Sequence, residues 1–94
     1  TALDHFAEAG SLYAAAGHRY GHTRCLVNSG IACQRLGRAG DAELSYREAL
    51  AMAESANVVD LAGLAAMNLG VLLTRAGRYE AADEQFQRAL RSFS

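Results

Sequence analysis

The sequence contains no proline, no lysine and no tryptophan, and each absence narrows what the chain can be. Without proline, no helix is interrupted by a residue that lacks a backbone N–H group. Alanine has the highest intrinsic helix propensity and fills 20 of the 94 positions, so an all-helical chain is favoured. All nine basic side chains are arginine, which together with the alanine content indicates a GC-rich bacterial genome.

A strong charge, a long apolar run and a cysteine pair at bonding distance are also missing. The formal net charge is −1, so no overall basic field exists to hold nucleic-acid phosphates. No apolar run approaches the roughly 20 residues of a membrane-spanning helix. Cys25 and Cys33, placed on one helix, would be about 12 Å apart along its axis, too far for a disulfide. Two free thiols are typical of a reducing compartment and predict a cytoplasmic protein.

A spacing of 40 residues recurs along the chain. A pattern of a small residue, an aromatic residue and a small residue occurs three times, and further positions agree between the second and third copies. A fixed period of this size is the signature of one supersecondary unit stacked on copies of itself, which is a solenoid. The triple pattern is Ala2, Phe6, Ala9, then Ala42, Tyr46, Ala49, then Ala82, Phe86, Ala89, and the paired positions include Asn28 with Asn68, Gly30 with Gly70 and Gly37 with Gly77.

Apolar residues within each copy recur every three or four positions, which is the period of an amphipathic helix. Gly37 and Gly77 are expected to end two of these helices in the left-handed conformation, and Gly17 and Asn57 two others. Asp60 can cap or charge the start of the helix that follows. The sequence therefore predicts five helices, over residues 2–16, 20–36, 39–56, 60–76 and 79–93.

The segment Asn68-Leu69-Gly70, followed by Gly77-Arg78-Tyr79, Ala82, Phe86, Ala89 and Leu90, closely resembles the tetratricopeptide repeat. The equivalent positions 40 residues earlier match the same pattern. The resemblance implies an all-α, right-handed α-solenoid of antiparallel helical hairpins with five helices. Residues 1–17 would then be the second helix of a truncated repeat, and residues 18–57 and 58–94 would each be a complete repeat.

Two features of this resemblance bear on what the whole protein is. The usual period of the family is about 34 residues, so a period of 40 resembles the longer subclass found in some signalling adaptors and bacterial regulators. Because the chain opens inside a repeat, we expect it to be part of a longer protein.

No catalytic motif is present: the sequence has neither a glycine-rich phosphate loop nor a nucleophile elbow. It therefore predicts a protein that is not an enzyme and holds no cofactor. His18, His22 and Cys25 could converge at one helix start, but a structural zinc site needs four ligands and a fourth is not apparent. We therefore expect no metal, and interpret these residues as two loop histidines and a small buried cysteine.

The resemblance implies that the first helix of each repeat lines a concave groove that binds a peptide or protein segment. Asparagine can hold the backbone of an extended peptide, and arginine can clamp a carboxylate. The alternative for Asn28 and Asn68 is that they bond only to neighbouring helices. Carried over residue by residue, the lining of the groove would be Arg24, Val27, Asn28, Ile31, Gln34, Arg35, Leu64, Met67, Asn68, Val71, Thr74 and Arg75.

The predicted function is a non-enzymatic module for protein–protein interaction, with a protein or peptide as partner and neither nucleic acid nor membrane. The alternatives are a structural or self-assembly segment, and a peptide-sensing part of a larger bacterial regulator. The lysine-rich carboxylate clamp of chaperone-binding members is disfavoured, because the chain has no lysine and Val27 and Ile31 stand where polar clamp residues would be needed.

Both ends of the array lack the polar cap that keeps a solenoid soluble. We therefore expect the chain in isolation to form a homo-oligomer through its ends. The apolar residues expected to be uncovered are Ala2, Phe6, Ala9 and Tyr13 at the start and Phe86, Leu90 and Phe93 at the end.

Overall fold

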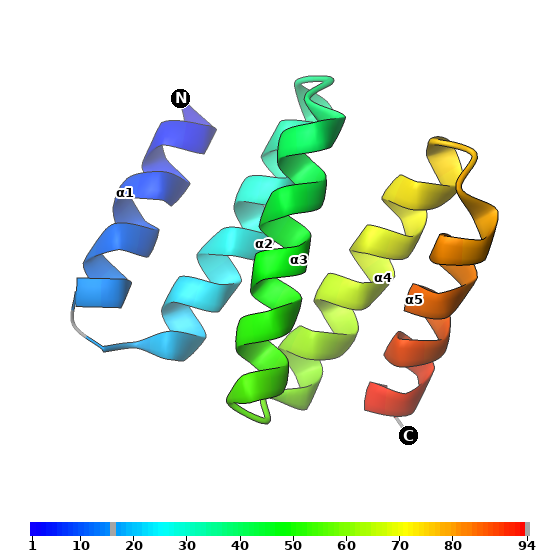
Figure 1. Cartoon of the computed structure of the whole chain (residues 1–94). Helices are drawn as coiled ribbons and strands as arrows, with labels where there is room; N and C mark the ends of the chain where they lie inside the picture. Colours follow the sequence, from blue (N-terminus) through cyan, green and yellow to red (C-terminus); the bar gives the residue numbers. More distant parts are fainter. Residues whose placement is uncertain (16, 94) are drawn as a thin grey trace.

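The computed structural model describes residues 1–15 and 17–93, and this part of the chain is helical with no strand. The five helices are α1 (Ala2–Ala15), α2 (Arg19–Arg35), α3 (Ala39–Ser55), α4 (Val59–Arg75) and α5 (Tyr79–Phe93). Successive helices run antiparallel, which confirms the predicted repeat solenoid (Figure 1). The predicted end of the first helix at residue 16 and the predicted end of the second repeat at residue 94 lie outside the described residues, and the other predicted helix boundaries agree to within one residue.

The helices form two layers. Each helix packs on the next one in the chain, and α2 also packs on α4, whereas among the described residues the backbones of α1, α3 and α5 do not pack on one another. Helices α2 and α4 therefore make one layer, and α1, α3 and α5 make the other. The Cα trace measures 37 × 31 × 14 Å, a flat slab in which every helix reaches the surface.

The links between helices are three residues long and use the left-handed conformation that the sequence predicts. The backbone φ angle is positive at Gly17, Gly37, Asn57 and Gly77. At each, two hydrogen bonds return to the carbonyl groups of the preceding helix, as in the bond of 2.8 Å from the Arg38 N–H group to the Cys33 oxygen. This is the Schellman arrangement, which satisfies carbonyl groups that a helix end leaves unpaired.

The start of α4 carries a charge rather than a side-chain cap. Val58 occupies the cap position of α4 without a side-chain hydrogen bond, and Asp60 lies in the first turn of the helix. Of the two roles predicted for Asp60, the structure therefore supports the charge, which complements the positive end of the helix dipole.

The core lies between α2, α3, α4 and α5, and aromatic rings pack there directly on glycines. A Cβ atom on Gly30 would lie 2.4 Å from Cε1 of Tyr46, and one on Gly70 would lie 2.6 Å from Cε1 of Phe86. Tyr46 is 0% exposed, and Phe86 is half-buried. The predicted placement of both glycines at helix contacts is confirmed. The expectation that nothing covers Phe86 is wrong, because its ring faces back onto α4, the helix before it.

An acidic side chain joins α3 to the link that precedes α5. Glu43 pairs through one oxygen with Nε of Arg47 at 2.9 Å and through the other with Nη1 of Arg78 at 2.8 Å. The hydrogen bond from Arg47, and then those of Arg78, hold the pKa of Glu43 below its usual value. The stability that the ionised Glu43 side chain gives the folded protein is present above the pKa of glutamate in the unfolded chain, and it is lost as the pH falls below that value.

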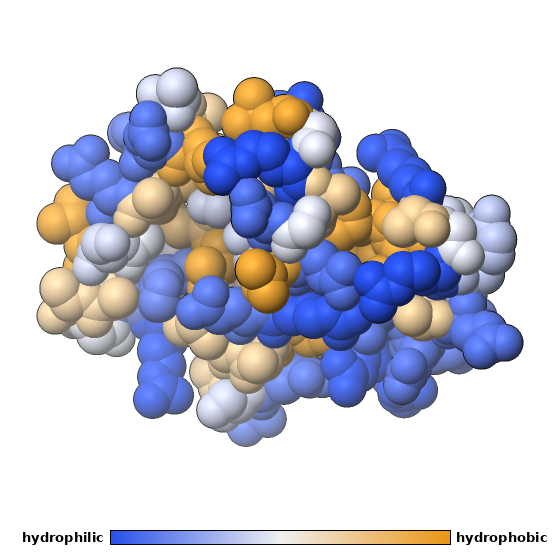
Figure 2. All heavy atoms as spheres, turned by 45° about the horizontal axis from the view of Figure 1, so that its top comes forward, coloured by the Kyte–Doolittle hydropathy of each residue, from blue (hydrophilic) through white to orange (hydrophobic). Residues whose placement is uncertain are grey.

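The two ends of the array leave apolar side chains exposed. Tyr13, Leu90 and Phe93 are all exposed, whereas Leu50, which precedes Leu90 by 40 residues, is buried under α4. On the side drawn in Figure 2, hydrophobic side chains reach the surface in separate patches between hydrophilic ones. No described helix combines the length and the apolar character that a membrane crossing requires.

Candidate functional site

Helices α2 and α4 present one shared surface, which we call the α2/α4 face. Its residues recur on α2 every three or four positions, so they form a stripe along one side of the helix. The residues 40 positions later form the same stripe on α4, which runs parallel to α2 in Figure 1. The five pairs are Tyr20 with Asp60, Arg24 with Leu64, Asn28 with Asn68, Ile31 with Val71, and Arg35 with Arg75.

Eleven of the twelve residues predicted to line a groove are accessible on these two helices, and one is not. Val27 is 1% exposed and belongs to the core, so it cannot offer contact area to a partner. Met67 stands 40 residues later and is exposed. The difference follows from the neighbours in space: α4 covers the flank of α2, and no described helix covers the same flank of α4.

The two asparagines differ in how their side chains are used. The Nδ2 atom of Asn68 donates a hydrogen bond of 2.9 Å to the backbone oxygen of Leu64, one turn earlier in α4. Asn28 makes no side-chain hydrogen bond to any described residue, so its donor and acceptor groups both remain available. The alternative that both asparagines bond to neighbouring helices is therefore not observed.

One hydrogen bond on the face joins two side chains that the sequence analysis did not place in the groove. The hydroxyl group of Tyr20 donates to Oδ2 of Asp60 at 3.3 Å, and this bond joins the first turns of α2 and α4. The two residues are 40 positions apart. Their shared register was the signal that could have identified them as neighbours.

A polar junction lies near the other end of the face, below its surface. The hydroxyl group of Tyr46, from α3, donates to Oε1 of Gln34 on α2. Burial raises the pKa of Tyr46 to about 12, with a further contribution from Cys33, and the positive charge of Arg75 partly opposes this rise. Arg75 lies in the last turn of α4 as Arg35 does in the last turn of α2, so the two arginines occupy equivalent places at this end of the face.

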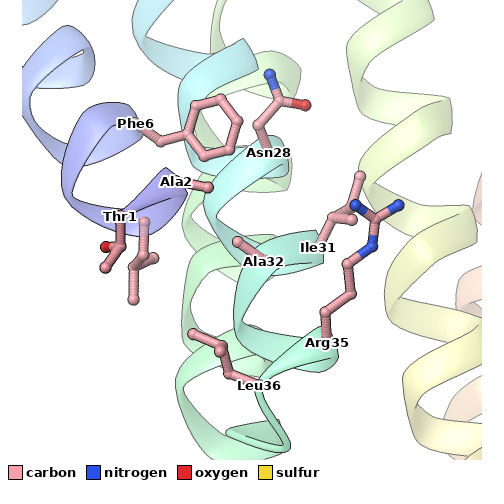
Figure 3. A pocket seen from close by; sticks show the side chains of 9 residues that line it. Thr1, Ala2, Phe6, Asn28, Ile31, Ala32, Arg35 and Leu36 are labelled. Atoms are coloured by element: carbon pink, nitrogen blue, oxygen red, sulfur yellow. The ribbon is translucent and has the colours of Figure 1, made fainter.

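A hollow of about 440 Å³ lies on the other flank of α2, between this helix and the start of α1. Figure 3 shows Phe6 of α1 beside Asn28, with Ile31 and Arg35 further along α2. The hollow therefore continues the α2/α4 face past α2 and adds an aromatic ring to it.

The candidate metal residues do not form a cluster. Cys25 is buried and His18 is exposed, and no group of three or more histidine, cysteine, aspartate or glutamate side chains that could hold a metal ion occurs within residues 1–15 and 17–93. Cys25 and Cys33 both lie on α2 and are free.

The hairpin formed by α4 and α5 is the part of the chain that resembles a known protein family. A family model described as tetratricopeptide repeat matches residues 64–92, which cover most of these two helices and the link between them. No curated protein and no solved structure matches the chain. Residues 64–92 therefore match a tetratricopeptide repeat, and within them Phe86 of α5 packs on Gly70 of α4.

Proposed function

We propose that this chain is a non-enzymatic interaction module that binds a protein or peptide segment on the α2/α4 face. The observation that carries the proposal is the stripe of equivalent, accessible residues on two parallel helices. Repeat arrays bind partners along extended surfaces of this kind. Residues 18–57 and 58–93 would act as two equivalent repeats of the longer, 40-residue type, and the setting we propose is the cytoplasm of a bacterium.

The chemistry of the face suits an extended segment. Asn28 can donate to and accept from the backbone of a peptide laid along α2. Ile31 and Val71 offer apolar contact area at the same level of the two helices. Arg35 and Arg75 stand at the end of the face, where their planar guanidinium groups can each bind an acceptor through two hydrogen bonds.

The test uses random peptides displayed on phage and selected on the immobilised chain. Peptides that bind the α2/α4 face should lose about tenfold or more in affinity when Asn28 and Asn68 are both changed to alanine. Gln87→Ala, an exposed change of the same kind on α5, is the matched control and should leave binding unchanged. Selected peptides that bind the double variant as well as the unchanged chain would contradict the proposal.

Self-association is the second candidate, and the exposed rings at the two ends of the array favour it. Phe93 and Tyr13 are both large and exposed, and leaving such a side chain in water forfeits roughly 1.5 to 3 kcal/mol relative to burial. Sedimentation velocity should detect a homo-oligomer that Phe93→Glu disrupts. The control is Leu44→Glu, which changes an exposed side chain away from the two ends and should leave the oligomer intact. A chain that stays monomeric at a concentration of tens of micromolar, where weak self-association is measurable, would refute this candidate.

A further inference from the structure

The net charge of −1 conceals a separation of charge between the two layers. Helices α2 and α4 together carry four arginines and a single carboxylate, Asp60. Helices α1, α3 and α5 carry nine carboxylates and three arginines, and the two remaining arginines lie in the links. One layer of the slab is therefore positive and the other is negative.

Ion pairing sharpens this separation. Arg38, Arg47, Arg78 and Arg88 all pair with carboxylates of α3, at distances from 2.8 to 3.8 Å. The arginines of the α2/α4 face, by contrast, form no ion pair with a described residue. The positive charge of the α3 and α5 side is thus neutralised within the molecule, and that of the α2/α4 face is left for the solvent or for a partner. The unpaired arginines of the face are Arg24, Arg35 and Arg75.

The spacing of these charges fits an extended chain. Arg24 and Arg35 are 11 positions apart on α2, which corresponds to about 16 Å along the helix axis. About five residues of an extended peptide span the same length. Arg35 and Arg75 occupy equivalent positions at the ends of two helices that touch, so one carboxylate can lie between them.

The residues between the arginines favour a peptide over a nucleic acid. Ile31, Met67 and Val71 place apolar surface between the charges, and Asn28 offers backbone hydrogen bonds. Nucleic-acid binding would instead require a row of phosphate contacts, each made by a basic side chain. The face has three unpaired arginines and one carboxylate, which is too short a row of positive charges to follow a phosphate backbone.

We propose that the α2/α4 face selects acidic segments: extended peptides in which carboxylates alternate with apolar side chains and meet Arg24, Arg35 and Arg75. This inference rests on the proposed function and adds the chemical class of the partner. The charge separation also orients the encounter, because the negative side of the slab repels the same ligand.

The test compares two labelled peptides of about eight residues, long enough to span the face at roughly 3.3 Å per residue. One alternates glutamate with leucine or valine, and the other has glutamine at every glutamate position. Fluorescence anisotropy should show at least about tenfold tighter binding of the acidic peptide, a preference that weakens as salt is added. Arg35→Gln with Arg75→Gln should remove most of that preference.

The matched control is Arg88→Gln, which removes the same charge from the other layer. Circular dichroism should confirm that every variant stays folded, because Arg35 and Arg75 also lie in the last turns of their helices, where a cation is mildly stabilising. Equal loss of the acidic preference in the control and in the double variant would overturn the inference.

The other outcomes separate this inference from the proposed function. Equal binding of the acidic and amide peptides, with binding still dependent on Asn28 and Asn68, would overturn the acidic preference and leave the interaction module standing. If changing Asn28 and Asn68 to alanine weakens the binding of neither these peptides nor the phage-selected peptides, the acidic preference and the proposed function are both overturned. Tighter binding of a single-stranded oligonucleotide than of the acidic peptide would also overturn the inference, since a phosphate backbone would then be the better ligand.

Discussion

Replacing Gly30 by alanine tests the contact between this glycine of α2 and the Tyr46 ring of α3. The added Cβ would lie 2.4, 2.7 and 2.9 Å from three carbons of the Tyr46 ring. That ring is completely buried and is anchored by a hydrogen bond to Gln34, so it cannot swing aside. Overpacking a site of this kind costs about 1 to 3 kcal/mol. Against this, alanine is favoured over glycine inside a helix by about 1 kcal/mol.

Because a contact of 2.4 Å lies far inside van der Waals distance, the overpacking cost should fall in the upper part of its range, at about 2 to 3 kcal/mol. After the gain in helix propensity is subtracted, the net loss in the free energy of unfolding should be about 1 to 2 kcal/mol. For a domain of this length, 1 kcal/mol shifts the melting temperature by roughly 4 to 8 °C. Gly30→Ala should therefore lower the midpoint of thermal unfolding, followed by circular dichroism at 222 nm, by about 5 to 15 °C.

Gly40→Ala is the matched control, because a Cβ there would meet nothing within 4 Å and the position is also helical. This variant should gain stability by up to about 1 kcal/mol. A double-mutant cycle with Tyr46→Leu should show that the cost at Gly30 comes from the ring, as the cost should shrink once the ring is gone. Equal shifts in melting temperature for Gly30→Ala and Gly40→Ala would refute the reasoning.

Three further predictions follow from other contacts. Gly63→Ala should change the melting temperature little. Its Cβ would lie 2.6 Å from the ring of Phe93, but that ring is largely exposed and can move. A loss of stability as large as that of Gly30→Ala would contradict this prediction. Ala82→Leu should cost about 1 to 3 kcal/mol in urea unfolding because residue 82 is buried, whereas Gln87→Leu, on the exposed side of α5, should cost little. Glu43→Gln should remove part of the stability that the unchanged protein loses as the pH falls below 4.5. The free energy of unfolding of the variant should therefore change less with pH between about pH 5 and 3 than that of the unchanged protein. The same slope in both proteins would show that the lowered pKa of Glu43 does not contribute to stability.

The local structure could be predicted from the sequence because its determinants are themselves local. Glycine and asparagine tolerate the left-handed conformation, so Gly37 and Asn57 marked helix ends without any knowledge of the packing. The apolar period of three to four residues predicted the five helices for the same reason. The contact of Gly30 with an aromatic ring was also predictable in kind, since a missing side chain within an apolar stripe allows another helix to approach closely.

The candidate site was less predictable, because exposure depends on which helix stands alongside. The 40-residue register correctly placed Asn28 and Asn68 at equivalent positions, but it gave Val27 and Met67 equal standing, and only one of them is accessible. The charge separation was present in the sequence as the near absence of acidic residues from 19–35 and 59–75. It became a property of a surface only when the packing placed those two segments side by side.

The sequence alone therefore determined the helices, their ends, the repeat register and the match of residues 64–92 to a known repeat family. Each of these depends on side chains within a few residues of one another, or on a pattern that recurs at a constant spacing. Only the tertiary structure decided which members of equivalent pairs are buried and which arginines pair with carboxylates. Burial and electrostatic fields depend on neighbours in space, and α2 has a neighbour on both flanks where α1 and α5 have one each.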